Sequence, residues 1–256
     1  MINYDYHNRE ERAICAHLFR LLHERLEDQS LSPLGIFLSK LSSSNLEFKN
    51  GKNPLTNLTF KNIAIYCEAS LIRDAYQNIK PTINPFMDDL TRLIMKQECI
   101  TTCRLYSQLP EPLNNSKLTH PKQIRQKAIT EGIQLSEDES KIYGAMQGMF
   151  NAKPDLVITI DNTLLVCEAK LIEKFDEEQL TRTRNIAEVW AMLLYKDLGF
   201  LEPPTYSVFK LGAKNYSPDI NWTSILEITT QTYNEYDRTR IAITAGVELL
   251  KRLQHE

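Results

Sequence analysis

The sequence contains no uninterrupted run of about 18 apolar residues, the length that a membrane-spanning helix requires. Its first segment, residues 1–11, is polar and charged, which is not typical of a secretory signal peptide. Cysteine is scarce and odd in number, with five residues in 256, and three of the five lie within apolar runs. This usage is typical of reduced core thiols. We therefore expect a cytoplasmic protein with no membrane association.

An excess of positive charge is also missing, because the formal net charge is -3. The bulk charge therefore gives no support to nucleic-acid binding, although a locally basic face can exist on an acidic protein. Cys99 and Cys103 have no second cysteine or histidine pair nearby, so the sequence does not favour a zinc site. We find no helix-turn-helix, zinc finger, RNA-recognition motif or internal repeat.

The apolar pattern predicts alternating helices and short buried strands, which is typical of an α/β protein. Residues 30–59, rich in Ser, Asn, Pro and Gly, and residues 107–121, with three prolines, are predicted to be loops. The predicted helices are 9–29, 85–97, 122–134, 137–150, 176–198 and about 235–253. The predicted strands are 63–69, 100–106, 155–160, 163–169, about 205–211 and about 224–229.

Two consecutive apolar runs, 155–160 and 163–169, are separated only by Asp161-Asn162, residue types that adopt positive φ in two-residue hairpin turns. With that turn, Ile160 lies opposite Thr163, and the same register places Asp155 opposite Glu168. Opposed side chains have Cβ atoms about 5 Å apart. Alternation along the strand puts Lys170 on the same face as Glu168. Three charged groups should therefore converge at one end of a buried hairpin.

This arrangement suits hydrolysis of a phosphodiester. Two carboxylates can hold Mg²⁺ or Mn²⁺, which prefer hard oxygen ligands. The metal polarises the phosphate and lowers the pKa of a bound water. The lysine can orient that water or stabilise the developing charge. The alternative is an exposed hairpin whose charges form a surface ion-pair cluster, but such a hairpin would show polar alternation instead of continuous apolar runs.

Pro154-Asp155, twelve intervening residues and Glu168-Ala169-Lys170 resemble the PD-(D/E)XK nuclease superfamily, which includes restriction endonucleases and Holliday-junction resolvases. The resemblance implies Asp155 and Glu168 as metal ligands, with a further contact from the Ala169 carbonyl, and Lys170 as the water-positioning group. It also implies a restriction-endonuclease-like core, a central mixed sheet flanked by helices. We expect one domain over 1–256, with an insertion at about 30–121 and a catalytic core at about 122–230.

The resemblance further implies a Mg²⁺- or Mn²⁺-dependent nuclease acting on DNA, most simply an endonuclease in restriction or phage defence, with RNA as an alternative substrate. Many relatives act as homodimers, so a homodimer is the default expectation, and partner proteins of a defence system are conceivable. A second hypothesis is a non-catalytic module on the same fold that binds nucleic acid or protein. The intact Asp155, Glu168 and Lys170 argue against it.

Members of this superfamily commonly supply another acid from a helix before the first core strand. Glu11 is our choice, because it continues the inward stripe of Ile14 and Leu18, and Glu10 is nearly as suitable. Both could instead serve only the helix dipole. Glu139 better fits a capping box beginning at Ser136. Glu68, in a strand-end Cys-Glu-Ala sequence without a following lysine, is a further alternative.

Gln179 and Arg182 lie at the start of the helix after the motif, on one face by their spacing. Many relatives carry a Gln or a basic residue there, facing the site or the phosphate backbone. We therefore expect Gln179 to assist the site and Arg182 to contact nucleic acid. The alternative is a solvated helix start.

Overall fold

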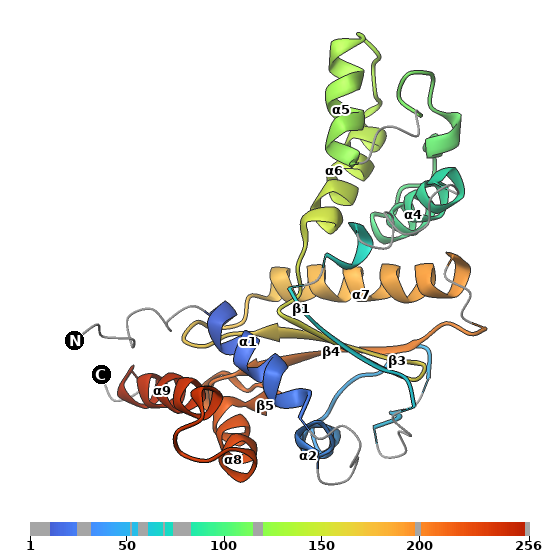
Figure 1. The fold of residues 1–256 in the computed structure, drawn as a ribbon. Helices are drawn as coiled ribbons and strands as arrows, with labels where there is room; N and C mark the ends of the chain where they lie inside the picture. The colour runs from blue at the N-terminus through green and yellow to red at the C-terminus, as the bar shows by residue number, and fades with distance from the viewer. Residues whose placement is uncertain are drawn as a thin grey trace. The chain divides into compact units, whose positions relative to one another are not determined.

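The computed structural model describes residues 11–24, 32–51, 53–55, 61–68, 70–73, 83–114, 120–197 and 201–253. These residues form an α/β fold with a five-stranded mixed sheet in the order β1-β2-β3-β4-β5 (Figure 1). The strands are β1 (Ile63–Cys67), β2 (Leu156–Ile160), β3 (Thr163–Ala169), β4 (Thr205–Gly212) and β5 (Ile220–Asn221). The strands β1, β2 and β3 are antiparallel, and β4 and β5 continue the sheet in parallel. The predicted α/β class is confirmed.

The chain divides into two compact units. The first contains the sheet and comprises the described residues within 1–69, 154–184 and 205–256. The second is helical and comprises those within 70–153 and 185–204. Residues 30–69, which the sequence assigned to an insertion, are thus grouped with the sheet.

The main apolar core lies on one face of the sheet, where four helices cover the odd-numbered side chains of β3, such as Leu165 and Cys167 (Figure 1). These helices are α1 (Glu11–Leu22), α2 (Pro33–Ser42), α8 (Trp222–Thr232) and α9 (Arg238–Leu253). The opposite face carries Val157, Val166 and Glu168, all buried. Both faces of β3 are therefore covered, as its continuous apolar sequence predicts.

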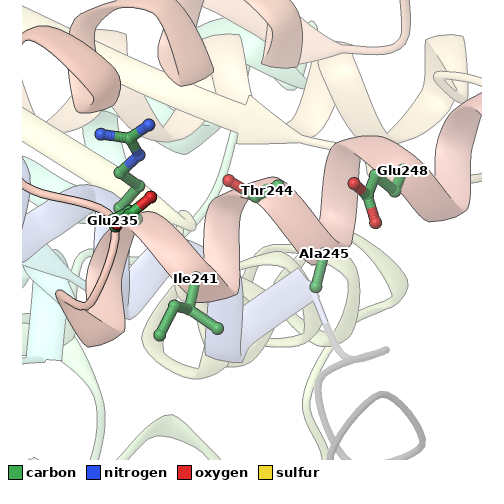
Figure 2. Close-up of a pocket in the computed structure, with 6 residues that line it drawn as sticks. Glu235, Ile241, Thr244, Ala245 and Glu248 are labelled. Atoms are coloured by element: carbon green, nitrogen blue, oxygen red, sulfur yellow. The ribbon is translucent and has the colours of Figure 1, made fainter.

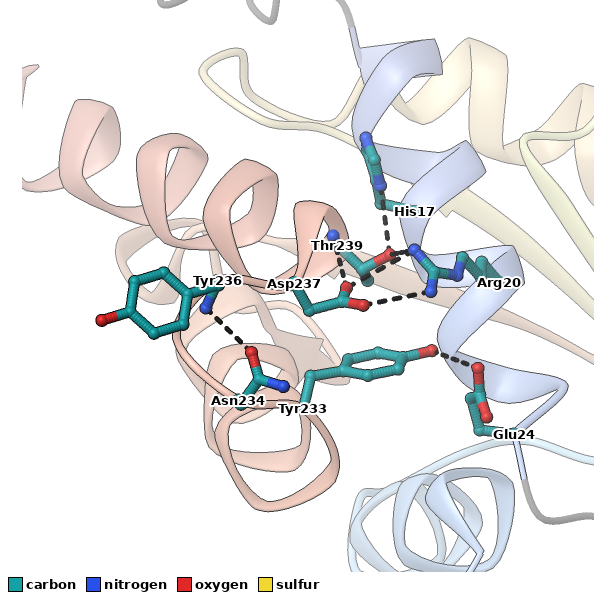
Figure 3. Close-up of polar contacts among 8 residues, drawn as sticks. All are labelled: His17, Arg20, Glu24, Tyr233, Asn234, Tyr236, Asp237 and Thr239. Atoms are coloured by element: carbon teal, nitrogen blue, oxygen red, sulfur yellow. Dashed lines mark hydrogen bonds and ion pairs between the residues drawn. The ribbon is translucent and has the colours of Figure 1, made fainter.

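A polar network joins α1 to the turn before α9 (Figure 3). Arg20 donates to both carboxylate oxygens of Asp237, at 3.4 and 3.1 Å, and to the Thr239 hydroxyl at 3.0 Å. The Tyr233 hydroxyl donates to Glu24 at 2.9 Å. His17 Nδ1 lies 3.3 Å from the Thr239 hydroxyl. The network fixes how α1 lies on the core, and with it the end of the sheet that α1 covers.

The helical unit contains α4 (Ile83–Gln97), η2 (Tyr106–Gln108), α5 (Pro121–Thr130) and α6 (Glu137–Asn151). Helix α7 (Glu177–Asp197) begins in the sheet unit and continues into the helical one. A last short turn, η3 (Lys214–Tyr216), lies between β4 and β5. No helix within the described ranges is long and apolar enough to cross a membrane.

Three of the predicted elements are wrong. Residues 224–229 belong to α8, because the Asn221 side chain accepts from the Ser224 N–H and starts a helix with Trp222, Ile225 and Ile228 buried. Residues 100–105 form no strand and lead into η2. The predicted loop at 30–59 contains α2, which Ser32 caps before a proline at the first helical position. Helix α1 ends at Leu22, well before the predicted residue 29.

Candidate metal centre

The hairpin formed by β2 and β3 has the predicted turn and register. Its pairs run from Ile160↔Thr163 to Leu156↔Cys167, so the next position places Asp155 opposite Glu168. Asp161 has a φ of 50°, the left-handed conformation that a two-residue turn requires at this position. A longer turn would have shifted the two strands and separated the carboxylates. The register prediction is therefore confirmed.

Asp155 is fixed against the neighbouring strand. Its Oδ2 accepts a hydrogen bond from the Ala169 N–H at 2.8 Å. Its carbonyl accepts from the Glu68 N–H at 3.4 Å, which continues the pairing of β1 with β2. Asp155 is thus held at the end of β2, with its carboxylate directed to the motif on β3.

Glu168 is the most enclosed of the three charged motif residues, with only 6% of its side chain exposed. Gln179 donates to Oε1, and the Thr183 hydroxyl lies 3.2 Å from Oε2. Burial and, to a smaller extent, the Asp155 charge raise the pKa of Glu168 to about 7, against the opposing charge of Lys170. At neutral pH, the groups around the two carboxylates therefore do not fully compensate their negative charge.

Lys170 completes the motif from the same face. Its Nζ lies 3.5 Å from Glu168 Oε1, and 11% of its side chain is exposed. Its backbone N–H donates to the Leu211 carbonyl at 2.8 Å, and its own carbonyl accepts from the buried Trp222 indole at 3.0 Å. These two hydrogen bonds fix the backbone position from which the Lys170 side chain extends. The buried pair is unlike the exposed ion-pair cluster considered from the sequence.

The Asp155 and Glu168 carboxylates repel each other, and a divalent cation bound by both would relieve that repulsion. Magnesium ions are commonly held by one or two carboxylates, with water and substrate phosphate oxygens completing the shell. Within the part of the chain that the structure describes, no three His, Cys, Asp or Glu side chains gather closely enough to hold a metal ion. Asp155 and Glu168 could therefore supply two ligands for such a cation, with other oxygens in the remaining positions.

The structure brings Gln179 to the site but not Arg182. Gln179 donates to Glu168, whereas Arg182 is 60% exposed and pairs with Glu178 at 3.1 Å. Arg182 does not contact the carboxylates, and its expected contact with nucleic acid stays a prediction. Thr183, one turn after Gln179, joins Gln179 at Glu168, and its i, i+4 spacing was the available signal.

The structure describes only some of the candidates for the expected additional acid. Glu11 begins α1, while its side chain and all of Glu10 lie outside the described residues. Ile14 lies close to Leu171, as both approach Gly246, so the start of α1 is at the same sheet end as Lys170. Glu68 has a φ of 51° and ends β1 beside Asp155.

Glu139 is part of a local structure in the helical unit. Its side chain accepts from the Ser136 N–H at 2.8 Å, while the Ser136 side chain accepts from the Glu139 N–H. The predicted capping box is confirmed. Arg104 donates to both carboxylate oxygens of Glu139 and lowers its pKa.

A cationic group that sequence reasoning missed is Lys210 on β4, which pairs in register with Glu168. Its Nζ lies 5.7 Å from the centre of the Phe175 ring. Phe175 lies so close to β4 that a Cβ at Gly212 would be 2.8 Å from its ring, so a larger residue there would displace the ring. Sequence alone could not find Lys210, because the pairing of β4 with β3 follows a long crossover.

The charge along this edge of the sheet changes sign. Asp155 directly precedes β2 and Glu168 lies on β3, while Lys210 lies next to Glu168 on β4. Asp219 accepts from the Lys210 N–H at 2.7 Å. Burial raises the pKa of Asp219, and the charges of Lys210 and Arg184 oppose that rise. A phosphate bound beside the carboxylates would thus have cations on its other side.

A hollow on the sheet unit lies elsewhere, along α9 and the turn before it (Figure 2). It contains none of the motif residues. Arg240, in its lining, donates to the Tyr233 carbonyl at 3.0 Å. Its lining consists of Glu235, Arg240, Ile241, Thr244, Ala245 and Glu248.

No family model, curated protein or solved structure matches the chain. The assignment of a role to this centre therefore depends on its residues and their geometry.

Proposed function

We propose that the protein is a metal-dependent nuclease that hydrolyses phosphodiester bonds of DNA, on a restriction-endonuclease-like core. The observation that carries the proposal is the enclosed group of Asp155, Glu168 and Lys170, with the Lys170 ammonium 3.5 Å from Glu168. Buried charges of this kind are costly to folding unless they serve a ligand or a reaction. Two adjacent carboxylates and one lysine are the groups that this hydrolysis needs.

Asp155 and Glu168 would hold Mg²⁺ or Mn²⁺, with the Ala169 carbonyl and Glu11 as the further ligands that the resemblance implies. When bound, the ion polarises the scissile phosphate and lowers the pKa of a coordinated water. Glu168 must be ionised to act as a ligand. Since its pKa is about 7, a cation would replace a proton there at neutral pH.

The remaining side chains orient the reacting groups. Gln179 and Thr183 fix the rotamer of Glu168 from the first turns of α7. Lys170, fixed through its backbone, would position the attacking water and stabilise the charge that develops on the phosphate. Lys210 and Arg184 provide positive charge for a neighbouring phosphate.

The sheet supports the same proposal. The antiparallel β1-β2-β3 meander, followed by α7 and the parallel strand β4, places the motif at one sheet end between helices. We extend the proposal to endonuclease action in restriction or phage defence, with a homodimer for cutting both strands. These extensions rest on the resemblance of the motif, and RNA is the alternative substrate.

A cleavage assay tests the activity. Purified protein should cut labelled duplex DNA with Mg²⁺ or Mn²⁺ and leave it intact in EDTA. Asp155→Asn should lower the cleavage rate at least about 100-fold, because it removes a ligand charge while keeping the shape of the side chain. Glu173→Gln, at an exposed position after the motif, is the matched control and should cut normally.

Single-stranded DNA and RNA are included in the same assay to define the substrate. Cleavage of RNA alone would reassign the substrate and keep the chemistry. Equal cleavage by Asp155→Asn and the unmutated protein would contradict the assignment of the site.

A further inference from the structure

Helix α5 in the helical unit carries three cationic side chains and no acidic one. Lys127 forms an ion pair with Glu131 at 2.5 Å. Lys122 and Arg125 are exposed, and no described carboxylate lies within ion-pair distance of either. Helix α5 thus carries a local positive charge in a chain whose net charge is -3. This local charge fits an anionic partner.

The exposed residues of α5 form one stripe. Arg125 and Gln126 lie three and four residues after Lys122, and Ile129 lies four and three residues after them, which places all four on one helix face. Ile129 is 81% exposed. The stripe thus combines two cations, an amide and a small apolar surface, and α6 covers the other side of the helix through Ile124 and Ala128.

Helix α6 packs against α5 (Figure 1). Its residues beside this stripe are uncharged. Arg125 donates to the Gln147 side chain at 3.2 Å, and the His120 ring nitrogen lies 3.2 Å from the Asn151 side-chain oxygen. Residues 142–151 contain no charged side chain. The cations on α5 therefore have no neighbouring carboxylate along this part of α6.

Two glycines on the same edge of α6 have no explanation in the packing of the described residues. A Cβ at Gly148 would meet nothing within 4 Å, and one at Gly144 would meet only Arg125, at 4.0 Å. Glycine is the least favourable residue in a helix interior after proline. Both positions could hold alanine without a clash. Their effect is to leave the α6 backbone open beside Arg125, where a ligand could approach closely.

We propose that this α5–α6 surface, formed by Lys122, Arg125, Gln126, Ile129, Gly144 and Gly148, binds duplex DNA. Lys122 and Arg125 contact phosphates, the glycines admit the sugar-phosphate chain, and Gln126 faces the base edges. The choice of DNA as the partner rests on the proposed function. The surface gives the proposed nuclease a DNA contact outside its metal centre.

The test measures binding without cleavage. A short labelled DNA duplex is titrated with protein in EDTA at several salt concentrations, and Kd is read from fluorescence anisotropy. Lys122→Gln with Arg125→Gln should raise Kd at least about tenfold at low salt. The slope of log affinity against log salt should become shallower by about 2, because each lost phosphate contact removes about 0.9.

The control is Lys251→Gln with Arg252→Gln, which removes two exposed cations from the last turn of α9 and should leave Kd within about twofold. Gly144→Ala with Gly148→Ala should raise the Tm, since alanine favours the helix, and yet weaken DNA binding. A purely structural role for the glycines would not give both effects.

Wild-type affinity and slope in the Lys122 and Arg125 variant would overturn the inference, as would an equal loss in the control. The outcome is separable from that of the proposed function. If the unmutated protein cuts DNA but the variant binds normally, only this surface is wrong. If the variant loses binding but no preparation cuts DNA, only the nuclease proposal is wrong.

Discussion

Lys170→Met should lower the rate of DNA cleavage at saturating substrate by about 100-fold or more, the usual cost of losing one group that stabilises the transition state. Methionine keeps the length of the side chain within its enclosed site but removes the ammonium 3.5 Å from Glu168. Binding of Mn²⁺ should persist, because Lys170 is not a ligand. The measurement is single-turnover cleavage, with calorimetry of the metal alongside it.

The matched control for Lys170→Met is Lys174→Met, which removes an exposed lysine four residues later. It should cut at the unmutated rate when DNA is saturating. If Lys170→Met cleaves as fast as the control, Lys170 does not act in the reaction. If Lys170→Met no longer binds Mn²⁺, the lysine organises the ligands instead of the water.

Glu168→Gln should abolish metal binding and nevertheless stabilise the metal-free protein at pH 8. In the folded protein, burial and the Asp155 charge raise the pKa of Glu168 from 4.5 to about 7. A carboxyl whose pKa is raised on folding favours the folded state while protonated. Stability is therefore lost as the pH rises from 4.5 through 7. At about 1.4 kcal/mol for each pH unit, the loss above pH 7 is about 3 kcal/mol.

Glutamine carries no charge, so the Glu168→Gln variant should lack this pH-dependent loss. It can keep the bonds to Gln179 and Thr183, although Lys170 loses its ionic partner. We expect urea unfolding in EDTA to give a gain of about 1–3 kcal/mol at pH 8 and none at pH 4. A variant that is destabilised equally at both pH values would show that Glu168 is only a structural residue.

The sequence predicted the hairpin well because the relevant signals are local. Asp161-Asn162 determines the turn, and the turn determines that Asp155 lies opposite Glu168. Because side chains alternate between the two faces of a strand, Lys170 then lies on the same face as Glu168. None of these steps requires knowledge of the remaining fold.

Predictions failed where tertiary contacts decide the outcome. The run at 224–229 is apolar enough for a strand, and only the Asn221 cap and the burial of Trp222 reveal a helix. Thr183 contacts Glu168 because of the rotation of α7 about its axis, which helix propensity cannot predict. Lys210 joins the site through pairing of β4 with β3, a contact between distant segments.

The central claim is that Asp155 and Glu168 form one divalent-cation site, and calorimetric titration with Mn²⁺ tests it most directly. The unmutated protein should bind Mn²⁺ at pH 7 with release of protons, since part of Glu168 is protonated before binding. Glu178→Gln, at an exposed glutamate, should bind equally. Asp155→Asn and Glu168→Gln should each lose the binding heat. Unchanged Mn²⁺ binding in both of these variants would contradict the account.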